Sequence, residues 1–534
     1  MCPTRQSGSE TKKNEDLAGF YKSGRTGYRI LKLEIRCRPD LRPTTQNILS
    51  PSVKLSGEFM SEKNTKAEIL RVFELQKKFK WSLRQTTAQE RREKLKKLKE
   101  KIFAESENLY QALWQDYKKP REEADLAEVL PVIAEIHDSV KNLPDWMRPK
   151  VVETPIHLGT ARSEIHYEPL GQTLIIAPWN YPFNLSIAPL ISAIAAGNTV
   201  MLKPSEYAPH TAEFLARILK DLFYEEEVAV FQGDASVSTE LLKLPFDHMF
   251  FTGAPSIGKV VMKAAAEHLS VCTLELGGKS PVIVENTADV REAGKRIAWG
   301  KWVNAGQTCI APDYVLVSED KKEALINAIH DAVKSFYGQT PIEWRNSADF
   351  CRIVNKRHFD RVKGLIDDAK KRGAQVAFGA DTDEHDNYIS PTVITDIAEG
   401  SRILEEEIFG PVLPIVTYRH LDEALEYIRR GEKPLALYVF SSSESTIENV
   451  LRNTAAGGTS INDCLMQFVN PKLPFGGCNN SGLGRYHGHH GFKAFSHERA
   501  VFKQSRLFNP MQIFYPPYGG QFRETFQKFI RHIM

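Results

Sequence analysis

The sequence predicts an α/β protein whose sheets are largely parallel. Three observations support this fold class: short apolar β-type runs, helical stretches between them, and a chain of 534 residues, long enough for two domains and an appendage. Short buried strands that alternate with helices are typical of parallel sheets covered on both faces. The predicted strands are Thr173–Ala177, Thr199–Leu202, His248–Phe251, Pro281–Val284 and Tyr314–Val317.

Residues 1–59 differ in composition from the rest of the chain. They are rich in Ser, Thr, Arg and Pro and have little apolar periodicity, which predicts a disordered extension. Arg and Ser are also typical of organelle transit peptides, but Glu10, Glu15 and Asp16 argue against one, because such peptides avoid acids. We therefore expect the folded body to begin near Met60.

The first folded region, residues 64–146, has a helical pattern. A capping box is expected at Thr87–Glu90, and Leu95, Leu98 and Ile102 then recur at helical spacing between Lys and Glu residues. This pattern predicts helices over this region.

Two further elements are predicted around the first strand. Residues 155–169 indicate a hairpin that turns at Gly159-Thr160. Beyond the strand, residues 185–196 form an apolar helical stretch, and Gly197 is expected to end it. From residue 465 the tail is rich in Gly, Pro, Asn and aromatic residues.

The composition excludes several classes of protein. With 42% hydrophobic and 26% charged residues it is ordinary for a globular chain, and its net charge of +3 is too small to indicate nucleic-acid binding. The seven cysteines form no CxxC pair, which argues against a zinc ribbon or disulfide framework and favours a reducing, cytoplasmic location. No apolar run is long enough to span a bilayer. The segment His487-Gly-His489-His490 lacks other ligands, so we expect solvated histidines and no metal.

Cys309, Glu275 and Asn180 form a candidate catalytic group. Cys309 alone would be a core residue, but it ends a polar Gly-Gln-Thr-Cys loop. Glu275 lies in an apolar run, where burial suits a general base, although a structural acid at a turn is an equal alternative. Asn180, between prolines, either donates to an oxyanion or caps a turn. A thiolate, a carboxylate and an amide donor together suit attack on a carbonyl.

Two segments at strand ends suit a dinucleotide. Lys203-Pro-Ser-Glu206 follows a strand and offers a cation and an anion for phosphate and ribose, and Glu206 suits a free 2′-hydroxyl; an exposed loop is the alternative. The segment from Gly253 to Gly258 joins a strand to a helix whose N-terminus could hold a pyrophosphate. Its spacing is not the GxGxxG fingerprint, so it is weak evidence alone.

Taken in order over residues 65–505, these motifs resemble the aldehyde dehydrogenase superfamily. The match also includes Glu406-Glu407-Ile408-Phe409-Gly410-Pro411, Pro474-Phe475-Gly476-Gly477 and Asn480-Ser481-Gly482. Details such as the Ala-Pro-Asp-Tyr that follows Cys309 and Ile310 look like the class 3 branch, which handles medium-chain, long-chain and aromatic aldehydes.

The resemblance implies a role for each matched residue. Cys309 would be the nucleophile, Glu275 the base, and Asn180 with the Cys309 backbone N–H the oxyanion hole. NAD is the implied cofactor, with NADP tolerated. The implied cofactor contacts are Lys203 and Glu206 at the adenosine ribose, Gly253 and Gly258 at the phosphates, Glu407 at the nicotinamide ribose and Phe409 beside its ring.

The resemblance also implies a domain plan. It has a Rossmann-like NAD-binding domain over residues 60–273, with a bridging hairpin near 151–170. An α/β catalytic domain over 274–460 and a bridging C-terminal tail over 461–534 complete it, and the hairpin and tail are expected to build a homodimer.

Alternatives to an aldehyde dehydrogenase remain at this stage. An acylating enzyme that uses coenzyme A shares the fold but typically lacks the carboxylate at Glu275, and a non-enzymatic scaffold would not need Cys309. The C-terminal stretch 521–534 places apolar residues at helical spacing. We expect it to dock on the protein or its dimer partner, with weak contact to a membrane surface as the less favoured alternative.

Overall fold

The computed structural model describes residues 62–159, 161–506, 509, 511–512, 515–518 and 520–533. The predicted extension, residues 1–59, lies outside the described residues, and so does Thr160 of the predicted turn. The chain divides into the units Met1–Phe59 and Met60–Met534, and the second contains every described element.

Six strands form the first sheet: β3 (Gln172–Ile176), β4 (Thr199–Lys203), β5 (Val228–Val230), β6 (His248–Gly253), β7 (Val271–Leu276) and β17 (Gly482–Leu483). Their order is β17-β7-β6-β3-β4-β5. All neighbouring pairs are parallel except β17 and β7, which are antiparallel. The tail of the chain therefore returns to this sheet beside β7.

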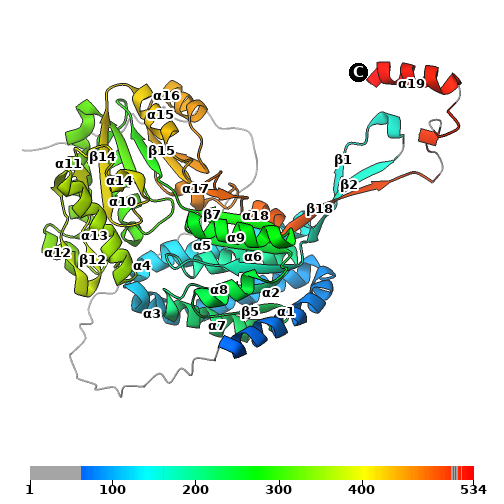
Figure 1. The fold of residues 1–534 in the computed structure, drawn as a ribbon, viewed down its shortest axis with the longest axis horizontal. Helices are drawn as coiled ribbons and strands as arrows, with labels where there is room; N and C mark the ends of the chain where they lie inside the picture. The colour runs from blue at the N-terminus through cyan, green and yellow to red at the C-terminus, as the bar shows by residue number, and fades with distance from the viewer. Residues whose placement is uncertain are drawn as a thin grey trace, which may run out of the picture. The chain divides into compact units, whose positions relative to one another are not determined.

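Helices cover both faces of the first sheet (Figure 1). One face packs against α2 (Ala88–Ala104), α5 (Leu130–Trp146), α6 (Asn184–Ala196) and α7 (Pro209–Leu222). The other face packs against α1 (Glu62–Arg84), α8 (Ala235–Leu242) and α9 (Pro255–His268). Because both faces are covered, all five residues of β3 and of β4 are buried.

Seven strands form the second sheet: β8 (Pro281–Val284), β9 (Tyr314–Ser318), β10 (Gln375–Phe378), β13 (Thr392–Thr395), β14 (Val412–Tyr418), β15 (Ala436–Phe440) and β16 (Gly458–Ile461). Their order is β10-β13-β14-β9-β8-β15-β16, and only the β10–β13 pair is antiparallel. The helices α10 (Val290–Trp302), α11 (Lys322–Tyr337) and α13 (Lys356–Lys371) cover one face, and α15 (Leu421–Arg430) and α16 (Glu444–Asn453) cover the other.

A third sheet joins the hairpin to the C-terminal segment. It consists of β1 (Lys150–Val152), β2 (Arg162–Pro169) and β18 (Ser496–Lys503), and β18 pairs with β2 along its whole length. The final helix α19 (Gly520–Ile533) contacts the hairpin, since the Phe529 ring lies 5.6 Å from that of His157.

Short elements complete the second unit. The helices are α3 (Ser106–Tyr117), α4 (Arg121–Ala124), η1 (Asp125–Val129), η2 (Ile156–Leu158), η3 (Val303–Gly306), η4 (Glu319–Lys321), α12 (Pro341–Asn346), η5 (Glu384–Asp386), α14 (Arg402–Glu405), α17 (Met466–Val469) and α18 (Gly488–Ala494). The two-stranded ribbon is β11 (Thr382–Asp383) with β12 (Tyr388–Ile389).

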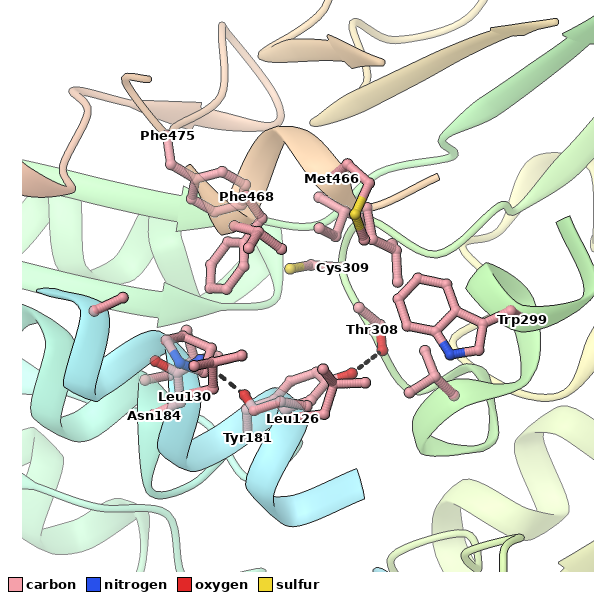
Figure 2. Close-up of a pocket in the computed structure, with 18 residues that line it drawn as sticks. Leu126, Leu130, Tyr181, Asn184, Trp299, Thr308, Cys309, Met466, Phe468 and Phe475 are labelled. Atoms are coloured by element: carbon pink, nitrogen blue, oxygen red, sulfur yellow. Dashed lines mark hydrogen bonds between the residues drawn. The ribbon is translucent and has the colours of Figure 1, made fainter. Parts of the chain in front are cut away.

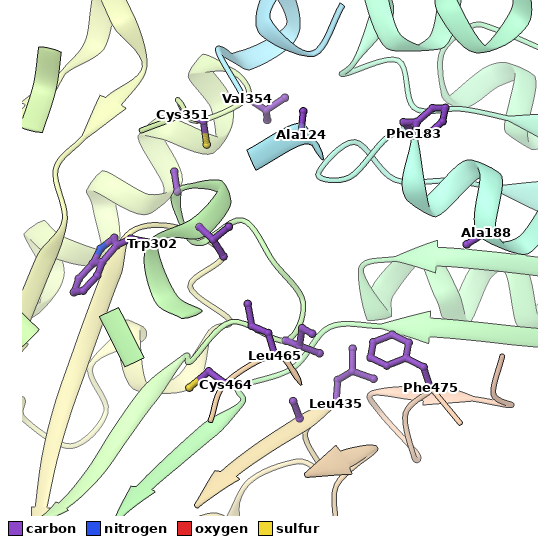
Figure 3. Packing of buried hydrophobic residues seen from close by; sticks show 14 of the residues in the cluster. Ala124, Phe183, Ala188, Trp302, Cys351, Val354, Leu435, Cys464, Leu465 and Phe475 are labelled. Carbon is purple, nitrogen blue, oxygen red and sulfur yellow. The ribbon is translucent and has the colours of Figure 1, made fainter. Parts of the chain in front are cut away.

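One apolar cluster extends across both large sheets. Figure 3 shows part of it: Phe183 and Ala188 come from the first sheet's side, Trp302 and Leu435 from the second, and Phe475 from the tail. The two lobes therefore share a continuous core, which fixes the loops between them.

Most sequence predictions of local structure are confirmed. The five predicted strands are β3, β4, β6, β8 and β9, each within two residues of the expected bounds. The capping box is present, with Thr87 and Glu90 bonded reciprocally. Helix α6 ends at Gly197, whose φ is 90°.

Two predictions need correction. The first arm of the hairpin is β1, Lys150–Val152, so the hairpin begins before residue 155; β1 pairs with the end of β2 nearer the turn. His487 is not solvated, because its ring is buried between Phe475 and Tyr486. The domain boundaries predicted after residues 273 and 460 stay a prediction.

Gly197 provides a stability test with a matched control. A Cβ there would lie 2.5 Å from the guanidinium carbon of buried Arg91, whereas Gly373, at φ 96°, has nothing within 4 Å. We expect Gly373→Ala to cost about 1 kcal/mol, the price of a left-handed alanine, and Gly197→Ala to cost more. Thermal unfolding midpoints of both variants check this. Equal unfolding midpoints would contradict the expected steric clash between a Cβ at position 197 and Arg91.

Candidate active site

The Cys309 loop begins with three left-handed residues. Helix α10 ends at Trp302, and Asn304, Ala305 and Gly306 then have φ values of 56°, 50° and 74°. At Gly306 only glycine fits, because a Cβ would lie 2.3 Å from the carbonyl oxygen of Gly410. This sharp reversal directs the chain into the loop that carries Cys309.

Gln307 holds the loop through its buried side chain. Its Nε2 donates to the carbonyls of Asn304 and Arg352, both at 3.0 Å, and its Oε1 accepts from the Val354 N–H at 3.0 Å. Next to it, the hydroxyls of Thr308 and Tyr181 are 2.6 Å apart. The residues that precede Cys309 are therefore fixed before any ligand binds.

Asn180 lies in the turn after β3 and is buried. Its Nδ2 donates to the Gln307 carbonyl at 3.0 Å, and its own carbonyl accepts from the Tyr117 hydroxyl at 2.9 Å. The structure thus brings Asn180, predicted from sequence, to the loop that contains Cys309, 129 positions later in the chain.

Glu275 is a buried carboxylate at the end of β7. Its backbone pairs with Gly482 of β17, and the neighbouring Leu276 N–H donates to Ser481 at 3.0 Å. Burial raises the pKa of Glu275 to about 8, and the Tyr486 phenol opposes part of that shift although the two groups form no well-aligned hydrogen bond. A carboxyl that titrates near neutral pH suits a general base.

Cys309 has electrostatics that keep its thiol protonated in the absence of ligands. Burial is the main cause that raises its pKa well above the usual value, and the negative charges of Glu275 and Glu407 add to it. Both carboxyls are near enough to the sulfur for their charge to affect its pKa.

Glu407 and Phe409 lie on the segment that follows α14. Burial raises the pKa of Glu407 to about 8, and its Oε1 has no hydrogen-bond partner. A Cβ on Gly277 would lie 2.1 Å from this carboxylate. The backbone φ of Phe409 is 46°. The centroid of its ring lies 5.4 Å from that of Trp179 in a T-shaped contact.

The predicted dinucleotide segments lie at the ends of β4 and β6. Buried Lys203 pairs with Glu206 at 2.6 Å, and the Glu206 side chain is exposed at 33%. Gly253 ends β6 just before the exposed N-terminus of α9. Gly258 allows α9 to approach β7, since a Cβ would lie 2.6 Å from Leu276.

Cys309 lines an apolar pocket between the two lobes (Figure 2). Its walls come from η1 and α5, from α10, and from the tail around α17. Only a few polar groups reach it, including the hydroxyls of Tyr181 and Thr308. The lining residues that the sequence analysis does not assign to the site include Leu126, Leu130, Tyr181, Trp299, Met466, Phe468 and Phe475.

Few features of the sequence mark these lining residues as part of a site. Tyr181 and Phe475 lie inside motifs already recognised, so their neighbours mark them. Leu126 and Leu130 are partly exposed apolar residues on helices, which sequence alone does not distinguish from core positions. Within the described ranges, no three His, Cys, Asp or Glu side chains gather as a metal site would require.

Comparison with known proteins defines the class. Residues 54–501 match the aldehyde dehydrogenase family, so the chain belongs to that family. Its relatives are NAD(P)-dependent oxidoreductases that oxidise aldehydes, and this chain is an enzyme of that class.

Three similar proteins place the chain within the class. It is 44% identical over 434 residues to the 4,4′-diaponeurosporen-aldehyde dehydrogenase of Staphylococcus aureus, covering 81% of this chain and 93% of that protein. The dimeric NADP-preferring aldehyde dehydrogenase of Rattus norvegicus is 43% identical over 415 residues, 78% and 90% of the two chains. A substrate-bound structure of Staphylococcus aureus AldH superposes with a TM-score of 0.82 at 42% identity, covering 86% and 99%.

Among the helices of residues 62–533 that the structure describes, none combines the length and apolar character needed to cross a bilayer.

Alkylation tests the environment of Cys309. Cys309 faces the pocket, whereas Cys351 and Cys464 are buried in the core. We expect iodoacetamide at pH 8 to label Cys309 before Cys351 and Cys464. We also expect Glu275→Gln to speed this labelling, because it removes a negative charge that raises the thiol pKa. Peptide mapping by mass spectrometry gives both rates. Faster labelling of Cys351, or an unchanged rate in Glu275→Gln, would contradict this description.

Proposed function

We propose that this enzyme oxidises apolar aldehydes, aliphatic of medium or long chain or aromatic, to carboxylic acids with NAD(P)+. The observation that carries the proposal is the placement of a cysteine thiol at an apolar pocket, electrostatically coupled to two buried carboxyls. A pocket with so few polar groups favours aldehydes without charges or hydroxyls. The Staphylococcus aureus relative is named for 4,4′-diaponeurosporen-aldehyde, which supports an aldehyde as the substrate.

Cys309 starts the reaction in this proposal. The Cys309 thiol gives up its proton to solvent and its sulfur bonds to the aldehyde carbon, while the carbonyl oxygen gains the negative charge. The second N–H of Asn180 Nδ2 and the backbone N–H of Cys309 stabilise that oxyanion. The first N–H of Asn180 stays on the Gln307 carbonyl, which holds the amide in position.

The residues present fit a dinucleotide. Gly277 leaves space beside Glu407 that any Cβ would fill, and the unpartnered Glu407 Oε1 suits a ribose hydroxyl. Lys203 and Glu206 would hold the adenosine ribose, Gly253 and Gly258 would border the phosphates, and Phe409 would pack beside the nicotinamide. When bound, NAD(P)+ supplies the acceptor for the hydride that leaves the aldehyde carbon.

Glu275 completes the reaction. Once the acyl group is a thioester on Cys309, the Glu275 carboxylate takes a proton from water, and the hydroxide attacks the acyl carbon. The C–S bond breaks, the sulfur takes that proton from Glu275 to restore the thiol, and the carboxylic acid leaves. The same carboxylate argues against the acylating alternative, in which coenzyme A would accept the acyl group. The presence of Cys309 argues against a scaffold.

We further propose a homodimer in the cytoplasm, with α19 docked on the protein. The rat relative is named dimeric, and the contact between His157 and Phe529 supports docking over membrane contact.

The direct test is NADH or NADPH formation from hexanal and benzaldehyde. Both should be oxidised without coenzyme A, and Cys309→Ala should abolish the activity. A requirement for coenzyme A would support the acylating alternative, and normal turnover by Cys309→Ala would refute the proposal.

Glu275→Gln should separate the two halves of the reaction. The variant forms the thioester but lacks the base for its hydrolysis, so we expect a burst of NADH and then turnover reduced about 100-fold or more. Wild-type turnover should rise with pH through about 8, because only the deprotonated carboxyl accepts a proton from water. Stopped-flow absorbance from pH 6.5 to 9 measures both effects. A wild-type rate that falls over this range, or a variant without a burst, would contradict the role.

Glu206→Gln should shift the cofactor preference toward NADP. The change removes a like charge near the 2′-phosphate and frees the Lys203 ammonium, so we expect the NADP-to-NAD ratio of kcat/KM to rise about tenfold. Glu213→Gln, an exposed acid on α7, is the matched control and should leave the ratio unchanged. An unchanged NADP-to-NAD ratio in Glu206→Gln would mean that the adenosine ribose does not bind beside Glu206.

A further inference from the structure

We infer that Asn304 is a positioning residue for the reaction, because its side chain sets Asn180 against the Cys309 loop. The inference rests on the proposed function, in which Asn180 stabilises the oxyanion. Asn304 is fully buried between the turn after β3 and the Cys309 loop, and it touches neither the pocket nor the predicted cofactor segments.

The Asn304 carboxamide joins the two halves of the site. Its Nδ2 donates to the Asn180 carbonyl at 2.9 Å and to the Gln307 carbonyl at 3.0 Å. Both partners are carbonyl oxygens, so the NH2 group must face them, and this fixes the orientation of the amide. Its Oδ1 faces the Cys351 thiol at 4.0 Å. Every polar group of this side chain is therefore used.

The Gln307 carbonyl is the shared acceptor. It receives Nδ2 of Asn304 and Nδ2 of Asn180, each at 3.0 Å. Because one N–H of Asn180 is held there, the other has a defined direction. Asn304 fixes both the backbone of Asn180 and the carbonyl that orients its amide, so it controls where that second N–H points.

The backbone of Asn304 is held as firmly as its side chain. Its φ of 56° and ψ of 28° lie in the left-handed region, which asparagine tolerates better than most residues. Its N–H donates to the Glu123 carboxylate at 2.9 Å. The same residue therefore starts the reversal that leads to Cys309 and orients the amide opposite it.

Tyr117 offers an internal comparison. Its hydroxyl also donates to the Asn180 carbonyl, at 2.9 Å, but has no bond to Gln307. Tyr117→Phe removes one support of the Asn180 backbone and leaves the shared acceptor intact. We expect a smaller rate loss than from loss of the Asn304 amide.

A double-mutant cycle with the full-length enzyme tests the inference. The variants are Asn304→Gly, which keeps the left-handed backbone accessible and removes the amide, Asn180→Ala, and the two combined. We expect the NADH burst rate with hexanal to fall about 10- to 100-fold in Asn304→Gly and about 100- to 1000-fold in Asn180→Ala. The double variant should be no slower than Asn180→Ala, since Asn304 acts through Asn180.

Two controls separate positioning from general damage. Asn387→Gly changes another asparagine with positive φ, 47°, outside the site, and should keep the wild-type burst rate. Asn304→Leu keeps about the same volume and removes the donors without burying a charge, so it replaces Asn304→Gly if the glycine variant does not fold. It should show the same lack of additivity.

The outcomes distinguish the inference from the proposed function. Additive losses in the double variant, or a wild-type burst rate in Asn304→Gly, would overturn the role of Asn304. If Asn180→Ala itself keeps the wild-type rate, the proposed oxyanion role of Asn180 fails instead, and the inference fails with it.

Discussion

The hydrogen bond from the Asn180 amide to the Gln307 carbonyl, 3.0 Å long, is the contact on which the site depends. It joins the turn after β3 in the first sheet to the loop after α10 that leads into the second. Neither sheet alone brings an amide donor to the Cys309 thiol. The continuous apolar cluster beneath both loops holds the lobes close enough for this bond to form. The geometry proposed for catalysis is therefore a consequence of how the two sheets pack.

Burial of charge is the second constraint. Glu275 and Glu407 are carboxyls in a site that excludes water, and burial raises the pKa of each to about 8. Burial also raises the pKa of the Cys309 thiol, and any negative charge on the two carboxyls raises it further. The same exclusion of water that makes ionisation costly strengthens hydrogen bonds to an oxyanion. In the proposed mechanism, the apolar pocket therefore serves both substrate binding and the electrostatics of the reaction.

The sequence predicts the strands and the candidate catalytic residues better than it predicts the contacts that hold those residues in place. Parallel strands with buried runs are visible as apolar segments, and Cys309 and Glu275 stand out because their neighbours are unusual. The roles of Asn304 and Gln307 are not visible, since they depend on left-handed backbone and on bonds between distant segments. The short strand β5 and the polar-flanked β7 were not predicted, because tertiary packing overrides their weak periodicity. The burial of His487 is not visible either, because only the fold supplies its aromatic neighbours.

The most direct test of the account is to identify the acyl-enzyme. Glu275→Gln, incubated with hexanal and NAD+ and then acid-quenched, should carry one hexanoyl group, and peptide mapping should locate it on Cys309. The same treatment of Cys309→Ala should give no adduct. A hexanoyl group on another residue, or NADH formation with no adduct on the enzyme at any time, would contradict covalent catalysis by Cys309.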